Sequence, residues 1–196
     1  MARPKKSQEG PSAQARLEEA WWQLLAQPAD QLTVRNLCRL AGVNHNTLYY
    51  HFESLEDMAQ KMFERTLTPN LAQKMLPILF GRNFFEGLSA VLPDLPLRFS
   101  HMCLMARSPL VAPRMRSFLV SAWLTGLGIR KESLSHTEEL MFTFISNGVV
   151  GVLSAVDAKA GIQEVYALTE TTLFAGLTGA LRDIAKAHGT ALPENG

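Results

Sequence analysis

Residues 32–52 constrain the fold more than any other part of this chain. They divide into two short helical patterns separated by Ala41-Gly42-Val43. Thr33 stands where an N-cap side chain would accept a backbone N–H of the first helix, and Asn44 stands in the same place before the second. Gly42 can take the left-handed conformation that a tight break between helices needs. Two short helices joined in this way form a helix-turn-helix.

The second of these helices, residues 44–52, has an outer face that is polar and aromatic. Leu48 and Phe52 stand at i and i+4 and are expected to turn inward. An ordinary solvated face carries a mixture of Lys and Glu, whereas amides, hydroxyls and rings can reach base edges, thymine methyls and phosphates. We therefore interpret the outer face as a DNA-reading surface, with plain packing of the aromatic run as the alternative. The side chains on or beside it are Asn44, His45, Asn46, Thr47, Tyr49, Tyr50 and His51.

The rest of the chain also has a helical period, which predicts an all-α fold. Leu17, Trp21, Leu24 and Leu25 form one apolar stripe on a first helix. Ser54 opens a fourth helix that runs to about residue 68. Prolines then divide a run of shorter helices, before three longer ones at about 113–130, 136–156 and 163–188. No window shows sustained strand alternation. We expect an N-terminal three-helix head at residues 12–53, linked through helix 54–68 to a larger helical body within residues 54–190.

Composition is that of a folded protein, and its charge does not indicate a nucleic-acid partner. The chain has 196 residues, 47% of them hydrophobic and 19% charged, with a formal net charge of +1. The local pattern differs from this average, because no acidic residue lies between Asp30 and Glu53. Arg3, Lys5 and Lys6 precede the first acid; such an arm can enter a minor groove or simply keep the chain in solution.

Nothing in the sequence predicts export or membrane insertion. The start is polar and has no apolar stretch behind it, and two cysteines cannot build a multi-disulfide framework. The longest uncharged apolar stretch, residues 140–156, is shorter than the ~20 residues of a membrane span and indicates a buried helix. We expect a cytoplasmic protein with no membrane partner.

The helix-turn-helix resembles that of the TetR/AcrR family of transcriptional regulators. The matching pieces are Thr33-Val34-Arg35, Ala41-Gly42-Val43 and Thr47-Leu48-Tyr49-Tyr50-His51-Phe52, and the resemblance covers about residues 14–65. It implies a homodimer whose recognition helices enter successive major grooves of a near-palindromic double-stranded operator. It further implies a body that binds an effector and controls DNA binding through the helix after the head. We therefore expect a ligand-responsive regulator, and specifically a repressor.

Carried over position by position, the resemblance gives each head residue a role. Thr33, Tyr49 and His51 would contact phosphates, and Tyr50 a base or its methyl group. The residues at or near the bases would be Asn44, His45, Asn46 and Thr47.

The sequence departs from the family pattern in two places. Glu53 and Leu55 stand where the family often has lysines, and Pro28 stands where it commonly has a glycine. The departure at Glu53 and Leu55 predicts weaker non-specific DNA affinity, or a compensating contact from the N-terminal arm.

The body contains a population of aromatic and thioether side chains suited to an apolar or aromatic effector. Each of them can equally be plain core. His101 and Asn147 are the polar exceptions. The candidate pocket residues are Phe84, Phe85, His101, Met102, Met105, Phe118, Trp123, Phe142 and Asn147.

Helices 136–156 and 163–188 are the expected homodimer surface. Gly148, Gly151, Gly176 and Gly179 allow close helix approach, and a helix apolar on more than one face must be buried by something. The alternative is burial within one chain.

Catalytic motifs are incomplete. Gly87-Leu-Ser-Ala-Val91 lacks the last glycine of a nucleophile elbow, and His136-Thr-Glu-Glu lacks the second histidine of a zinc motif. We expect no enzyme, no cofactor and no metal. The main alternative to a regulator is a helical dimer that binds a small molecule or a protein without reading DNA; an all-α enzyme is a third hypothesis, with no motif in its favour.

Overall fold

The computed structural model describes residues 10–81, 83–158, 161–190 and 192, and the side chains of all of these except residues 69 and 70. Throughout these residues the regular structure is helical, without a strand, which confirms the all-α prediction. The chain divides into two compact units, and the boundary lies between Met62 and Phe63, inside helix α4 (Leu55–Thr66). We call the first unit the head and the second the body.

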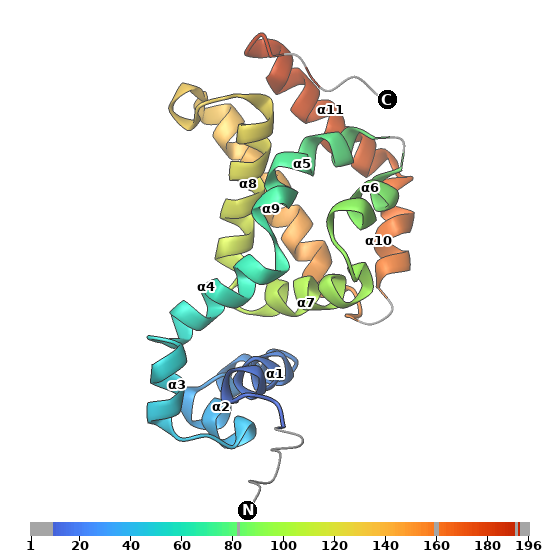
Figure 1. The fold of residues 1–196 in the computed structure, drawn as a ribbon. Helices are drawn as coiled ribbons and strands as arrows, with labels where there is room; N and C mark the ends of the chain where they lie inside the picture. Colours follow the sequence, from blue (N-terminus) through green and yellow to red (C-terminus); the bar gives the residue numbers. More distant parts are fainter. Residues whose placement is uncertain (1–9, 82, 159–160, 191, 193–196) are drawn as a thin grey trace, which may run out of the picture. The chain divides into compact units, whose positions relative to one another are not determined.

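The head is built by α1 (Ala13–Leu25), α2 (Val34–Ala41), α3 (His45–His51) and the beginning of α4 (Figure 1). The predicted apolar stripe of α1 is buried, and α1 packs against both α2 and α3. Arg16 on α1 donates from Nε to the carbonyl oxygen of Ala41, 3.0 Å away, at the last residue of α2. The main members of this core are Leu17, Trp21, Leu24, Leu37, Cys38, Leu48, Phe52 and Met58.

The turn between α2 and α3 has the predicted geometry. Gly42 lies in the left-handed region at φ 62°, ψ 41°, where a side chain would be strained. The N–H of Val43 bonds to the carbonyl of Cys38 at 3.0 Å, which closes the end of α2. Both helices also begin as predicted: the Thr33 hydroxyl accepts the Asn36 N–H, and the Asn44 side chain accepts the Thr47 N–H.

The body consists of the end of α4 and helices α5 to α11. Helix α5 packs on α8 and α6, and α9 packs on α7 and α8 (Figure 1). The rings of Trp123 and Phe142 stack between α8 and α9, with centroids 6.3 Å apart. The helices are α5 (Pro69–Phe80), α6 (Phe84–Val91), α7 (Leu95–Arg107), α8 (Ala112–Leu127), α9 (His136–Ala155), α10 (Ile162–Thr169) and α11 (Thr172–Ala187).

Both ends of α9 are held by side chains. Ser135 and Glu138 form a capping box at its start, and the Glu138 carboxylate also meets His188 of the α11 C-terminus at 3.0 Å. Arg107 of α7 donates to the carbonyl oxygens of Ser154 and Val156 at its end. These contacts anchor α9 against its neighbours at two points.

The single helix predicted at 163–188 is wrong, because the segment forms α10 and α11 with a break at Glu170 and Thr171. The hydroxyls of Thr169 and Thr171 donate to the carbonyls of Tyr166 and Leu168, at 2.7 and 2.6 Å. Such local bonds compete with the continuation of a helix.

The helix predicted at about 113–130 ends earlier, at Leu127. Gly128 follows it with φ 65°, and the Ile129 N–H bonds back to the carbonyl of Leu124 at 3.0 Å. Among the described residues, no helix combines the length and the hydropathy needed to cross a membrane.

Candidate functional site

The outer face of α3 presents the side chains that the sequence analysis singled out. Leu48 and Phe52 are 0% and 1% exposed, so they fix which side of the helix faces the head core. Tyr50, in contrast, is 84% exposed and Tyr49 is 52% exposed. Asn44, His45 and Asn46 are exposed, while Thr47 and His51 are half-buried. Contiguous exposed aromatic side chains with polar neighbours are typical of binding surfaces, and Tyr49 and Tyr50 are such a pair.

Two of the predicted DNA-contact residues, Asn44 and Thr33, also serve as the N-caps of α3 and α2. The Asn44 Oδ1 accepts the Thr47 backbone N–H at 2.8 Å and the Thr47 hydroxyl at 3.0 Å. The Thr33 hydroxyl accepts the Asn36 N–H at 3.2 Å. These bonds use the oxygens as acceptors, so the Asn44 amide hydrogens and the Thr33 hydroxyl hydrogen still serve as donors toward a phosphate or a base.

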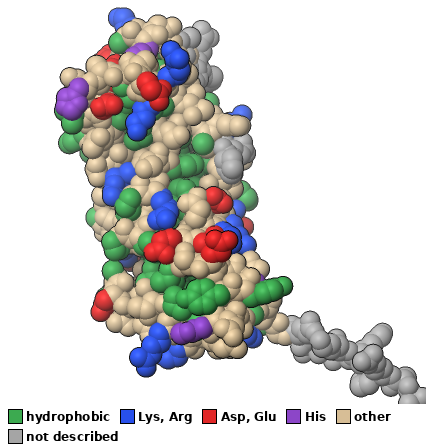
Figure 2. All heavy atoms as spheres, turned by 90° about the vertical axis from the view of Figure 1, so that its left-hand side faces the viewer, with side chains coloured by type: hydrophobic (Ala, Val, Ile, Leu, Met, Phe, Trp, Pro, Cys, Tyr) green, Lys and Arg blue, Asp and Glu red, His purple; other side chains and the backbone are tan. Residues whose placement is uncertain are grey.

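The surroundings of α3 carry basic and neutral side chains. Arg35 and Arg39 of α2 are exposed, and the stretch from residue 31 to residue 52 has no acid. Figure 2 shows one face of the head, where hydrophobic side chains lie next to a histidine and to Lys or Arg side chains. A neutral-to-basic surface of this kind suits a polyanion, although it lacks a dense array of lysines.

Lys61 lies at the corner between α3 and α4, near the positions Glu53 and Leu55 where the family often has lysines. The contacts of its ammonium are made within the head. Its ammonium lies 2.8 Å from the Asp57 carboxylate, donates to the carbonyl of His51 at 3.3 Å and stands over the Phe52 ring. Asp57 in turn accepts the backbone N–H of Glu53 at 3.0 Å. The hydrogen bond from Lys61, followed by that from Glu53, lowers the pKa of Asp57. The role of Lys61 was not predictable from the sequence, because its contact with the His51 carbonyl joins residues ten positions apart.

The loop after α1 accommodates Pro28 without a glycine. Pro28 precedes a short 3-10 turn, Ala29–Gln31, and Asn36 of α2 donates from its side chain to the carbonyl of Gln31 at 2.9 Å. The loop is therefore tied to α2. Arg3, Lys5 and Lys6 lie outside the described residues.

The nine predicted pocket residues are distributed over the body. Met102, Met105, Trp123 and Phe142 are buried in its core. Asn147 is exposed and donates to the Thr143 carbonyl of its own helix at 2.7 Å. Four more are half-buried: Phe84, Phe85, His101 and Phe118.

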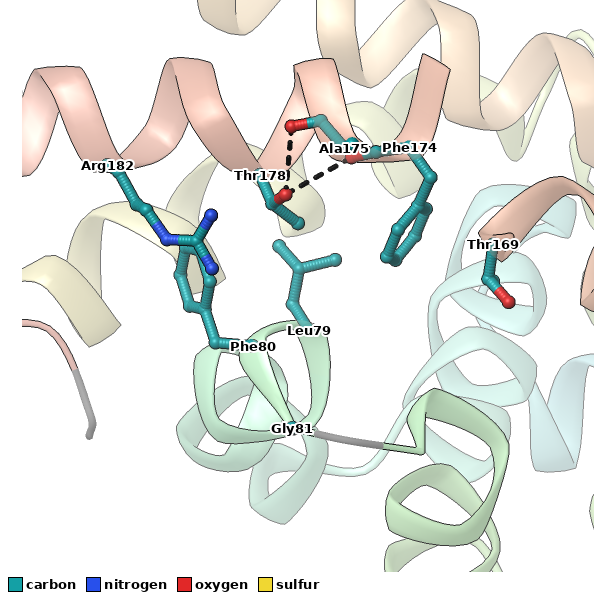
Figure 3. A pocket seen from close by; sticks show the side chains of 8 residues that line it. All are labelled: Leu79, Phe80, Gly81, Thr169, Phe174, Ala175, Thr178 and Arg182. Carbon is teal, nitrogen blue, oxygen red and sulfur yellow. Dashed lines mark hydrogen bonds between the residues drawn. The ribbon is translucent and has the colours of Figure 1, made fainter. Parts of the chain in front are cut away.

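Two hollows open on the body surface. The first, of about 290 Å³, is lined by residues of α5 and α11 together with Thr169, and Figure 3 shows its lining. The Arg182 guanidinium stands over the Phe80 ring at 5.0 Å, and the Thr178 hydroxyl donates to two carbonyls of its own helix. Its polar groups are thus largely engaged within the chain.

The second hollow, of about 320 Å³, is the one that contains a predicted pocket residue, Phe85. Phe85 and Tyr166 form one wall, with ring centroids 5.3 Å apart. Tyr166 is not among the predicted pocket residues, because its place depends on the break between α10 and α11. The lining is Phe85, Ser89, Leu95, Pro96, Ile162, Gln163 and Tyr166.

Two capped helices, a left-handed glycine between them and an exposed polar and aromatic face on the second define a helix-turn-helix DNA-binding protein. Residues 17–62 match the family model described as "Bacterial regulatory proteins, tetR family", and the matched segment ends at Met62, where the head ends. The chain therefore carries a DNA-binding domain of the TetR family, which supports a role as a transcriptional regulator. Comparison with curated proteins and with solved structures found no match. No group of three or more His, Cys, Asp or Glu suited to a metal ion occurs among the residues that the structure describes.

Proposed function

We propose that this regulator is a ligand-responsive repressor that binds a near-palindromic operator as a homodimer. The observation that carries the proposal is the exposed face of α3, where Tyr49 and Tyr50 stand in water beside Asn46 and His45. Asn46, His45 and Tyr50 would meet base edges and thymine methyls, while Thr33, Tyr49 and His51 would hold phosphates. Asn44, which caps the helix, and Thr47, which donates to the Asn44 side chain, would lie beside the bases.

The dimer would form through α9 and α11. Phe144 and Leu173 are 78% and 67% exposed, and Leu140 is also exposed, so each helix presents large apolar side chains to water. A Cβ added at Gly148, Gly151 or Gly176 meets no atom within 4 Å, which leaves room for a second helix to approach. Two heads in such a dimer would read half-sites about 34–36 Å apart.

The response to a ligand would pass through α4, which begins in the head and ends in the body. A small molecule can change DNA affinity only if it binds the DNA-competent and the incompetent conformation with different affinity. Release of DNA by a neutral, apolar effector is the direction we propose.

Fluorescence anisotropy of a labelled mixed-sequence duplex, titrated at several salt concentrations, tests the DNA-binding half of this proposal. We expect binding that weakens as salt rises, with a modest slope, because the described part of the interface holds few Lys and Arg side chains. Absence of binding at low salt would favour the alternative, a helical dimer that binds only a small molecule or a protein. One observation favours this alternative. The Asp57 carboxylate accepts the backbone N–H of Glu53, so this N–H already has an acceptor within the chain.

A further inference from the structure

We propose that the hollow lined by Phe85, Leu95, Pro96 and Tyr166 is a binding site for a neutral aromatic molecule, and that Arg98 transmits its occupation to α4. This inference rests on the proposed ligand response, and it names the site, the chemical class of ligand and the residue that couples the site to the head's helix.

The chemistry of the lining selects the class of ligand. None of the seven lining residues carries a charge, so a charged ligand would lose its water without gaining an ion pair. The Phe85 and Tyr166 rings supply an aromatic wall, and Ser89 and Gln163 supply two polar handles. A volume of about 320 Å³ lies at the lower end of the roughly 300–1,000 Å³ of small-molecule sites. A compound of two or three rings fits this description better than a peptide helix.

One wall of the hollow is the first turn of α7, which begins under backbone strain. Leu95 and Pro96 line the hollow, and Asp94 immediately before them has φ 57°. No other non-glycine residue of the described chain has a positive φ. An L-residue in the left-handed region costs free energy that its surroundings must hold in place. A ligand that contacts Leu95 and Pro96 therefore acts on a turn whose backbone conformation depends on its surroundings.

The same turn of α7 holds the end of α4 through Arg98. The guanidinium donates from Nε to the carbonyl of Pro93 at 2.9 Å. From Nη1 it donates to the carbonyls of Arg65 and Thr66, the latter at 3.0 Å. Arg65 and Thr66 are the last two residues of α4, where a cation also meets the negative end of the helix dipole. One side chain thus joins the strained turn before α7 to the end of α4.

Binding of N-phenyl-1-naphthylamine, a neutral probe whose fluorescence rises in apolar sites, tests the site in the full chain. We expect saturable binding to the wild type and a loss of at least about tenfold in affinity in Ser89→Phe, where the new ring fills the hollow. The matched control is Ala90→Phe, the exposed neighbour outside the lining, which should bind as the wild type does. Tyr166→Ala should weaken binding as well. No saturable binding, equal affinity in Ser89→Phe, or a change of oligomeric state in Ser89→Phe would overturn the site.

Hydrogen exchange with and without the probe tests the coupling. The Leu67 amide bonds to the carbonyl of Phe63 at 2.8 Å and reports on the last turn of α4. In the wild type and Ala90→Phe, the probe should change exchange in a peptide covering residues 63–68. In Arg98→Gln, and in Arg98→Lys should the first variant fold poorly, the probe should bind within about twofold of wild type but leave this exchange unchanged. A probe-dependent change that persists without Arg98 would overturn its role. Both measurements omit DNA, so their failure is distinguishable from failure of operator binding.

Discussion

Side chains two positions apart on α3 have opposite surroundings. Leu48 is enclosed by the head core and Tyr50 stands in water, and the same helical rotation accounts for both. The i, i+4 spacing of Leu48 and Phe52 was enough to predict this, because one buried pair fixes the rotation of so short a helix. The caps Thr33 and Asn44 were predictable too, since their chemistry is local.

Tyr50→Ala should weaken binding to the operator by about 1–3 kcal/mol, or roughly five- to 150-fold, because its exposed ring would lose its contact with a base or methyl group. The measurement is anisotropy with the wild type and the variant on one duplex. Gln23→Ala, an exposed change on α1, serves as the control and should leave affinity unaltered. Unchanged affinity in Tyr50→Ala would remove this residue from the interface.

Gly42→Ala should destabilise the head by about 1–2 kcal/mol, because alanine is strained at a φ of 62°. A Cβ there meets no atom within 4 Å, so the cost is one of backbone conformation and not of a clash. Urea denaturation of the two proteins measures it. Equal stability of Gly42→Ala and wild type would contradict the left-handed turn.

Among the helices, those of the head could be predicted from the sequence, whereas the division of the last segment of the body into α10 and α11 could not. Each head helix has a cap or a breaker at its boundary, whereas the break between α10 and α11 has no proline or glycine to mark it. It depends on the hydroxyls of Thr169 and Thr171. The contacts of Lys61 with His51 and Asp57 could not be predicted from the sequence either, because they require the folded corner between α3 and α4.

The capping box of α9 predicts a pH dependence of stability. Hydrogen bonds from the backbone N–H and hydroxyl of Ser135, and then from His188, lower the pKa of Glu138 from its ordinary 4.5. A carboxyl whose pKa is lower in the folded state adds stability above its unfolded pKa and loses it as pH falls through the folded value. Ser135→Ala removes the two largest causes.

We therefore expect Ser135→Ala to cost about 1 kcal/mol at pH 7 and progressively less as the pH falls below about 4.5. Urea denaturation of both proteins between pH 7 and pH 3 measures the difference. Ser117→Ala, at an exposed serine within α8, should show a small difference that does not vary with pH. A constant cost for Ser135→Ala over the whole range would contradict the role of the Glu138 carboxylate.

At the scale of the whole molecule, the sequence predicted two units with different tasks but not where the body would be hollow. Of the nine pocket candidates, four lie in the core of the body, Met105 and Phe142 among them, and the other five are half-buried or exposed. Composition alone cannot distinguish a residue that fills the core from one that lines a cavity, because both are apolar. Only tertiary packing brings Phe85 and Tyr166 together.

Gly148→Leu tests the proposed dimer. Within one chain the position is open, so the substitution should not lower the stability of the subunit. Where a partner's helix packs closely, the leucine would clash and weaken dimerisation by about tenfold or more. Sedimentation velocity over a range of protein concentrations measures this. The control is Ser121→Leu, at an exposed position of α8. The same dimerisation constant in both variants would place the interface elsewhere.

Every part of the proposed function depends on α3 reading a specific DNA sequence. Selection from a pool of random duplexes, performed in parallel with the wild type and with a variant carrying Asn46→Ala and Tyr50→Ala, tests it most directly. We expect the wild type to enrich a near-palindromic sequence with half-sites about one helical turn apart, and the variant to enrich none. If the wild type enriches no sequence, or the variant enriches the same one, α3 is not the element that gives this protein its specificity.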